Sequence, residues 1–116
     1  MRHQMKKVTL DRLSSGRRAL LANLAESLIL YEKIKTTKAK AKAVQSYVEK
    51  LITVSKKNTL AARRELIKDL YTQNAVKKLM EVLGPRYAER HGGYTRVIAT
   101  KTRVGDGAEE AFIELV

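Results

Sequence analysis

Residues 94–116, YTRVIATKTRVGDGAEEAFIELV, decide the fold class of this chain. Apolar and polar side chains alternate in residues 94–101 and 111–116, and the second segment sets Phe112 and Ile113 on opposite faces. Such alternation is typical of half-buried strands, and the short Gly105-Asp106-Gly107 connection predicts that the two strands form an antiparallel hairpin. Residues 33–37, KIKTT, form a third alternating segment. A segment this short is not stable alone, so we expect it to pair with the hairpin.

The segments outside the hairpin carry helical patterns. Helices are predicted for residues 15–31, for residues 38–57, after Thr59 and after Asn74. Their expected inward residues are, in that order, Leu20, Leu24, Leu28 and Tyr31; Val44, Val48, Leu51 and Ile52; Leu66, Ile67 and Leu70; and Val76, Leu79, Met80 and Leu83. The expected N-caps are Ser14-Ser15, Thr37, Thr59 and Asn74, and Gly84-Pro85 is expected to end the fourth helix.

These patterns predict an α+β fold in a single two-layer domain. About four helices should pack on a small three-stranded mixed sheet within residues 13–116. Residues 1–12 are basic and lack a sustained period. We therefore expect them to form a basic N-terminal arm that is disordered until it meets its partner.

The charge of the chain gives the first indication of function. Its 116 residues include 24 Lys and Arg against 12 Asp and Glu, which gives a net charge of +12 at pH 7. Repulsion of this size favours a polyanionic partner, and nucleic acid, an anionic membrane surface and an acidic protein are the candidates. A membrane-surface helix would leave its apolar side free, whereas several helices here can satisfy one another in a core. A DNA-compacting factor would need a groove-entering element, and no predicted helix carries an evident recognition face.

The sequence offers little for catalysis or metal binding. It has no Cys, and its two His residues, His3 and His91, lie in terminal or glycine-rich stretches. The Glu109-Glu110 pair lies in or near a strand, where adjacent side chains point to opposite faces. We therefore predict a protein that is not an enzyme and needs no metal or other cofactor. No signal peptide or membrane span is apparent, so a soluble cytoplasmic protein is expected.

The basic residues fall into three groups. The first comprises Arg2, Lys6, Lys7, Arg12, Arg17 and Arg18, with Asp11 as the single acid among them. The second comprises Lys33, Lys35, Lys38, Lys40 and Lys42, with no acid. Lys38 and Lys42 share a face in the first turn of the predicted second helix, where cations oppose the helix dipole. That placement indicates that an outside anion is expected there, although a solvated helix face is the alternative.

The third group interleaves Arg86, Arg90, Arg96 and Arg103 with Tyr87 and Tyr94. Arginine pairs with phosphate oxygens, and tyrosine can stack on an unpaired base. Gly92 and Gly93 have no side chains, so a nucleic-acid backbone could approach their N–H groups closely. The alternatives are core packing for the tyrosines and an ordinary turn for the glycines.

Residues 84–96, GPRYAERHGGYTR, resemble a hallmark segment of the bacterial large-subunit ribosomal protein seventeen family. The opening MRH, residues 34–37 (IKTT), GDGA at 105–108 and the closing IELV resemble the same family, so the resemblance covers essentially the whole chain. It implies an α+β domain that binds large-subunit ribosomal RNA near the rim of the polypeptide exit tunnel, beside other ribosomal proteins and without catalysis. Combined with the basic groups, it predicts an RNA-binding surface made of Arg2, His3, Lys6, Lys7, Arg12, Arg17, Arg18, Lys35, Thr36, Thr37, Lys38, Lys40, Lys42, Arg86, Tyr87, Arg90, Gly92, Gly93, Tyr94, Thr95, Arg96 and Arg103.

Overall fold

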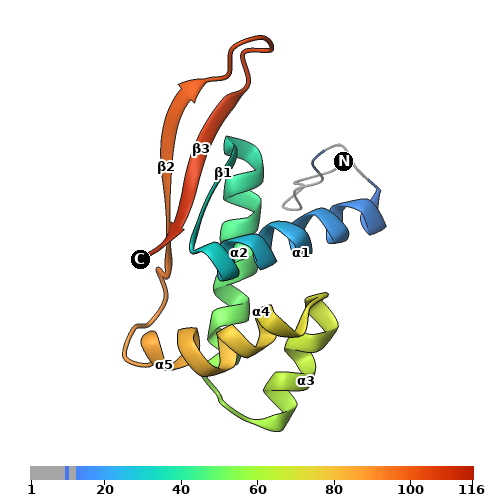
Figure 1. The fold of residues 1–116 in the computed structure, drawn as a ribbon, viewed down its shortest axis with the longest axis vertical. Coiled ribbons are helices and arrows are strands. Elements are labelled where there is room, and N and C mark those ends of the chain that lie inside the picture. The colour runs from blue at the N-terminus through green and yellow to red at the C-terminus, as the bar shows by residue number, and fades with distance from the viewer. Residues whose placement is uncertain (1–9, 11–12) are drawn as a thin grey trace, which may run out of the picture.

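The computed structural model describes Leu10 and residues 13–116. Its elements are α1 (Ser14–Tyr31), β1 (Lys33–Thr37), α2 (Lys38–Ser55), α3 (Leu60–Asp69), α4 (Gln73–Lys78), the π-helical turn η1 (Leu79–Leu83), α5 (Gly84–Arg86), β2 (Thr95–Thr102) and β3 (Glu109–Leu115). Because α4, η1 and α5 follow one another without a break, the helices form four segments, and the predicted α+β class is confirmed. In Figure 1, α2 runs through the centre, with the sheet and α1 at its upper half and α3 to α5 around its lower half.

Part of the sequence prediction lies outside the described residues. This part includes most of the expected N-terminal arm, with its predicted disorder, and the candidate RNA contacts Arg2, His3, Lys6, Lys7 and Arg12. The division of the chain into an arm and a domain therefore stays a prediction.

The sheet is antiparallel throughout, with β3 in the centre and the strand order β1-β3-β2. The hairpin and its pairing with β1 are confirmed, but the expectation of a mixed sheet is wrong. β1 and β2 run in the same direction and would make a parallel pair only as neighbours, whereas β3 lies between them. The register aligns Ile34 and Val97 with Ile113 in one row, and Lys35 and Ile98 with Phe112 in the next.

Successive rows of the sheet face opposite sides. Ile113 is fully buried and belongs to the core that α1 and α2 build, with Ile34 and Val97 packed against it. In the neighbouring row, Ile98 is 41% exposed and Lys35 is exposed. The sheet therefore has an inner face on the helices and an outer face toward solvent.

Two residues predicted to lie in the core are exposed instead, Tyr31 at 74% and Ile67 at 52%. The buried side of α1 consists of Ala22, Ala25, Glu26, Leu28 and Ile29. α1 is apolar around most of its circumference, so spacing alone does not fix which side faces inward. In α3, Ala62 and Leu66 are buried four residues apart, and Ile67 points roughly 100° away from Leu66.

Threonine hydroxyls cap three helices. Thr37 accepts from Lys40 N and Thr59 from Ala62 N, as predicted for α2 and α3. The cap of α4 is Thr72, not the expected Asn74. At the start of α1 the N-cap position is held by Leu13 instead of the expected serines, and Leu13 makes no side-chain cap bond.

The start of α4 is fixed from outside the helix. The nearly buried Glu26 carboxylate of α1 accepts from the backbone N–H groups of Tyr71 and Thr72, the latter at 2.9 Å. Thr72 is the N-cap residue of α4, and its N–H is among the donors that a helix N-terminus leaves without an intrahelical partner. The tertiary contact with Glu26 accompanies a helix start two residues earlier than the position expected from Asn74.

Gly84 does not end the fourth helix, which corrects the prediction from Gly84-Pro85. Its φ of −54° is helical, and the helix continues through η1 to Arg86. Pro85 is the second residue of α5, directly after the π-helical turn η1. The reason for glycine is a close approach, because a Cβ on Gly84 would lie 3.0 Å from Ser55 O and 3.2 Å from Leu79 O.

We predict that Gly84→Ala lowers the free energy of unfolding by roughly 1–3 kcal/mol, as overpacking against fixed backbone atoms does. Urea denaturation followed by circular dichroism measures the change. Helix propensity alone predicts the opposite sign, a gain of about 1 kcal/mol for alanine. A stabilised variant would therefore show that the contact with Ser55 does not require glycine.

Candidate RNA-binding surface

The candidate contacts within the described residues lie in separate regions of the fold. Arg17 and Arg18 are near the start of α1, and Lys38 to Lys42 begin α2. Residues 86–94 adjoin the other half of α2, where Lys56 reaches them. α2 has 18 residues and is therefore about 27 Å long. Lys38 to Lys42 and residues 86–94 thus lie toward its opposite ends. The single RNA-facing surface expected from the sequence is therefore divided into at least two regions.

The first turn of α1 is basic and has no acidic residue. Arg17 and Arg18 line a shallow hollow together with Ser14, Leu21 and Tyr47 of α2. Neither arginine forms an ion pair with any described residue. Cations at a helix N-terminus are repelled by the positive end of the helix dipole. An external anion that binds them would relieve this repulsion.

The start of α2 combines unpaired and loosely paired lysines. Lys40 and Lys42 have no ion-pair partner in the described part of the chain, whereas Lys35 lies 3.7 Å from Glu110. Lys38 reaches Glu109 only at 4.0 Å. Exposed pairs of this kind contribute little to stability, so a phosphate can replace the carboxylate at low cost.

The two candidate threonines beside these lysines have structural positions. Thr37 caps α2 through its hydroxyl, and Thr36 stands half-buried in register with Ala111 of β3. Their geometry therefore does not require an RNA contact, and that role stays a prediction.

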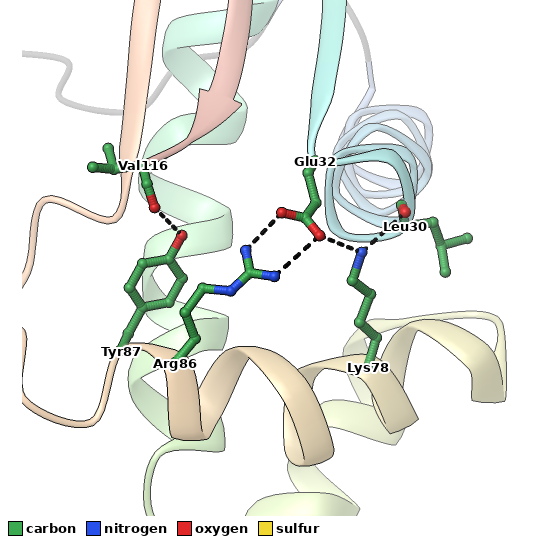
Figure 2. A network of polar contacts seen from close by, with 6 residues as sticks. All are labelled: Leu30, Glu32, Lys78, Arg86, Tyr87 and Val116. Atoms are coloured by element: carbon green, nitrogen blue, oxygen red, sulfur yellow. Dashed lines mark hydrogen bonds and ion pairs between the residues drawn. The ribbon is translucent and has the colours of Figure 1, made fainter.

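Arg86 and Tyr87 make internal contacts between separate elements of the fold (Figure 2). Arg86 donates to both carboxylate oxygens of Glu32, at 2.6 and 3.2 Å, and Lys78 donates to the same carboxylate at 2.9 Å. Tyr87 is 4% exposed and donates its hydroxyl to Val116 O at 2.7 Å. These contacts join the α4–α5 segment to the end of α1 and to the last residue of the chain.

Tyr94 and Thr95 are also buried by internal contacts. Lys56 donates to the Tyr94 hydroxyl at 2.9 Å, and this bond lowers the pKa of Tyr94. The rings of Tyr87 and Tyr94 are in contact, with centroids 5.2 Å apart. Thr95 donates through its N–H and hydroxyl to the Glu49 carboxylate. The core-packing alternative therefore describes both tyrosines.

Gly92 and Gly93 form an exposed turn with φ values of +88° and +63°. A Cβ at either position would meet nothing within 4 Å. Glycine is thus favoured here by the backbone conformation, and the space in front of the turn is open to a partner. Arg90 stands beside the turn and donates to Gly93 O at 3.1 Å.

The arginines of the hairpin are paired but exposed. Arg96 lies 3.3 Å from Glu114, and Arg103 lies 3.2 Å from Asp106 and 4.0 Å from Glu110. Their side chains are 57% and 45% exposed, respectively. Both can exchange a carboxylate for a phosphate without disturbing the core.

One aromatic residue was absent from the predicted surface. Phe112 stands on the outer face of the sheet with Lys33 Nζ 4.6 Å and Lys35 Nζ 5.8 Å from its ring centroid. The sequence could have indicated this position. Phe112 lies two residues from both Glu110 and Glu114 on β3, so all three share one side of the strand.

Comparison with known proteins identifies the family, because the sequence model described as Ribosomal protein L17 matches residues 20–116. The chain belongs to the ribosomal protein L17 family. It is 52% identical over 116 residues to the large ribosomal subunit protein bL17 of Orientia tsutsugamushi (strain Boryong), covering 100% of this chain and 80% of the relative. The bL17 proteins of Rickettsia bellii (strain OSU 85-389) and Koribacter versatilis are 48% and 49% identical over the whole chain, which covers 82% and 72% of their lengths.

Membership in the L17 family confirms the resemblance seen in residues 84–96. It also agrees with the prediction that the chain is not an enzyme, because the relatives are named as ribosomal proteins. Among the described residues, no helix is long and apolar enough to cross a membrane. The same part of the chain contains no group of three or more His, Cys, Asp or Glu side chains that could hold a metal ion.

The Glu32 bridge predicts a pH dependence of stability. Hydrogen bonds from Arg86 and Lys78 lower the pKa of Glu32 from 4.5 to about 2. The folded-state pKa is thus below the unfolded one, so the stabilisation is complete above pH 4.5 and is lost as the pH falls toward 2. Because the side chain is 38% exposed and solvent screens the pair, we expect about 1 kcal/mol at neutral pH.

Glu32→Gln should lower the free energy of unfolding by about 1 kcal/mol at pH 7. The difference from the unmodified chain should shrink as the pH falls from 4.5 to 2. Urea denaturation at several pH values measures it. Glu89→Gln is the matched control, since Glu89 is exposed and forms no ion pair with a described residue. An equal loss in both variants, or a loss that is independent of pH, would contradict the bridge.

Proposed function

We propose that this L17-family protein is a structural constituent of the large ribosomal subunit that binds large-subunit ribosomal RNA. The observation that carries the proposal is the basic start of α1 and α2, where Arg17, Arg18, Lys40 and Lys42 have no acidic partner among the described residues. The names of the bL17 relatives support the assignment to the large subunit.

The expected mechanism is electrostatic and structural. Arginine and lysine at the two helix starts neutralise phosphates and release counterions, which supplies most of the affinity. Specificity for folded RNA comes mainly from its shape and from unpaired bases. Arg2, His3, Lys6, Lys7 and Arg12 precede α1 in the sequence and are proposed as further phosphate contacts.

The finer placement rests on the family resemblance of residues 84–96 and the chain termini. We place the protein near the rim of the polypeptide exit tunnel, beside neighbouring large-subunit ribosomal proteins and ribosome-bound in the bacterial cytoplasm. Co-sedimentation with large subunits from a cell lysate, followed by crosslinking to the surrounding proteins, tests this placement.

RNA binding should weaken steeply with salt. Each neutralised phosphate contributes about −0.9 to the log–log slope for a duplex and roughly −0.7 for a single strand. The double variant Arg17→Ala, Arg18→Ala should weaken binding to purified large-subunit ribosomal RNA and flatten this slope. The matched control is Arg63→Ala, Arg64→Ala, which removes the same charge from exposed positions of α3. Equal losses in both would mean that net charge, and not the start of α1, directs binding.

The Gly92-Gly93 turn provides a second test. Gly93→Ala should cost about 1 kcal/mol of stability because φ is positive. Gly107→Ala imposes the same kind of strain at the hairpin turn, where φ is +67° and the space is also open. If RNA lies against the Gly92-Gly93 turn, only Gly93→Ala should also lower affinity beyond what its melting curve explains. Normal binding by a folded Gly93→Ala would make this turn a scaffold.

A further inference from the structure

The outer face of the sheet presents an aromatic ring among cations. The register places Lys35, Phe112 and Ile98 in one row across the three strands. The next row on the same face holds Lys33, Glu114 and Arg96. Neighbouring strands lie about 4.8 Å apart, so each row spans roughly 10 Å, wide enough to accommodate a nucleobase.

Phe112 is not a core residue. Its side of β3 carries two carboxylates, whereas the alternating residues Ala111 and Ile113 are fully buried against the helices. The ring is half-buried, and its described cationic neighbours are the ammonium groups of Lys33 and Lys35. It is the single Phe in a chain without Trp.

The charge of this face favours an anion. Glu110 is already paired with Lys35, and Glu114 with Arg96. Lys33 has no carboxylate partner among the described residues, and its recorded contact is the Phe112 ring. The face therefore keeps a positive excess while offering an apolar centre at Phe112 and Ile98, the latter 41% exposed.

We propose that the outer face is a stacking platform for an unpaired base of RNA. Phe112 supplies the stacking surface, and Lys33, Lys35 and Arg96 bind the flanking phosphates. Aromatic rings beside basic residues on an open sheet are suited to single-stranded nucleic acid, because every base has a π-face. The proposal rests on the RNA-binding function above and assigns it a second, base-contacting region.

The lysines over the ring are compatible with this role. A cation–π contact at an exposed site is weak, so a base can displace the ammonium group. Lys35 is 49% exposed and can turn from the ring toward a phosphate while its stem stays on the sheet. Binding then exchanges two weak cation–π contacts and the Lys35–Glu110 and Arg96–Glu114 pairs for one stacking contact and charge-assisted hydrogen bonds to phosphates.

The test compares two probes of equal charge, a 12-nucleotide oligouridylate and an abasic analogue with the same phosphates. The full chain should prefer the oligouridylate, and Phe112→Leu should lose this preference, with a roughly 5- to 100-fold lower affinity for the oligouridylate. Phe112→Tyr keeps the aromatic ring and should bind like the unmodified chain. Circular dichroism and melting curves establish that each variant is folded.

A fluorescent reporter gives an independent measurement. Because the chain has no Trp, Phe112→Trp introduces a single indole on the platform. Its emission should be quenched by the oligouridylate and not by the abasic probe. Tyr31→Trp, at a position that is 74% exposed at the end of α1, is the matched control and should not respond.

The outcomes separate this proposal from the proposed function. Equal affinity for both probes, or an unaltered preference in Phe112→Leu, overturns the platform and would fit a face that binds a protein instead. Binding of large-subunit ribosomal RNA that still depends on Arg17 and Arg18 would leave the proposed function standing. If the unmodified chain does not bind that RNA at all, the proposed function fails as well.

Discussion

The position of Glu32 is the constraint on which the arrangement of the two layers depends. Its φ of +65° ends α1, and its N–H donates to Leu28 O at 2.7 Å. Its carbonyl accepts from Leu115 N at 2.9 Å, and its carboxylate binds Arg86 and Lys78. One residue therefore joins the turn between α1 and β1, the end of the central strand and the α4–α5 segment. These polar contacts add to the apolar core that packs both the sheet and the α4–α5 segment against α2.

This bridge also divides the cations of the chain into two classes. Arg86 and Lys78 are committed to Glu32, and Lys56 is committed to Tyr94 and Arg90 O. Cations at the starts of α1 and α2 and on the outer face of the sheet are unpaired or lie 3.3 to 4.0 Å from a carboxylate. The basic residues that close the fold are thus distinct from those that can meet RNA, although both classes look alike in the sequence.

The sequence predicts features that depend on local chemistry, and fails where tertiary contacts decide. Period-two alternation located all three strands, and the hydroxyls of Thr37 and Thr59 marked two helix starts. Glycine is required at position 84 because the Ser55 backbone approaches it closely, and no local sequence pattern predicts that contact. The separation of the candidate contacts along α2 follows from packing, so the grouping of charges in the sequence could not reveal it. Tyr87 and Arg86 were candidate contacts because their chemistry suits RNA, and the same chemistry suits internal bonds.

Ion pairs on the outer face of the sheet allow a chain of net charge +12 to fold and still leave cations that RNA can bind. Without RNA, the carboxylates of Glu110 and Glu114 lie beside Lys35 and Arg96 and reduce repulsion across the sheet. Each cation is about half exposed, with 49% of the Lys35 side chain and 57% of the Arg96 side chain accessible, so phosphates can compete with the carboxylates for it. The same carboxylates oppose binding by any anion too weak to displace them. The paired cations are therefore oriented before RNA arrives, and they favour a polyanion, whose many phosphates act together, over single anions.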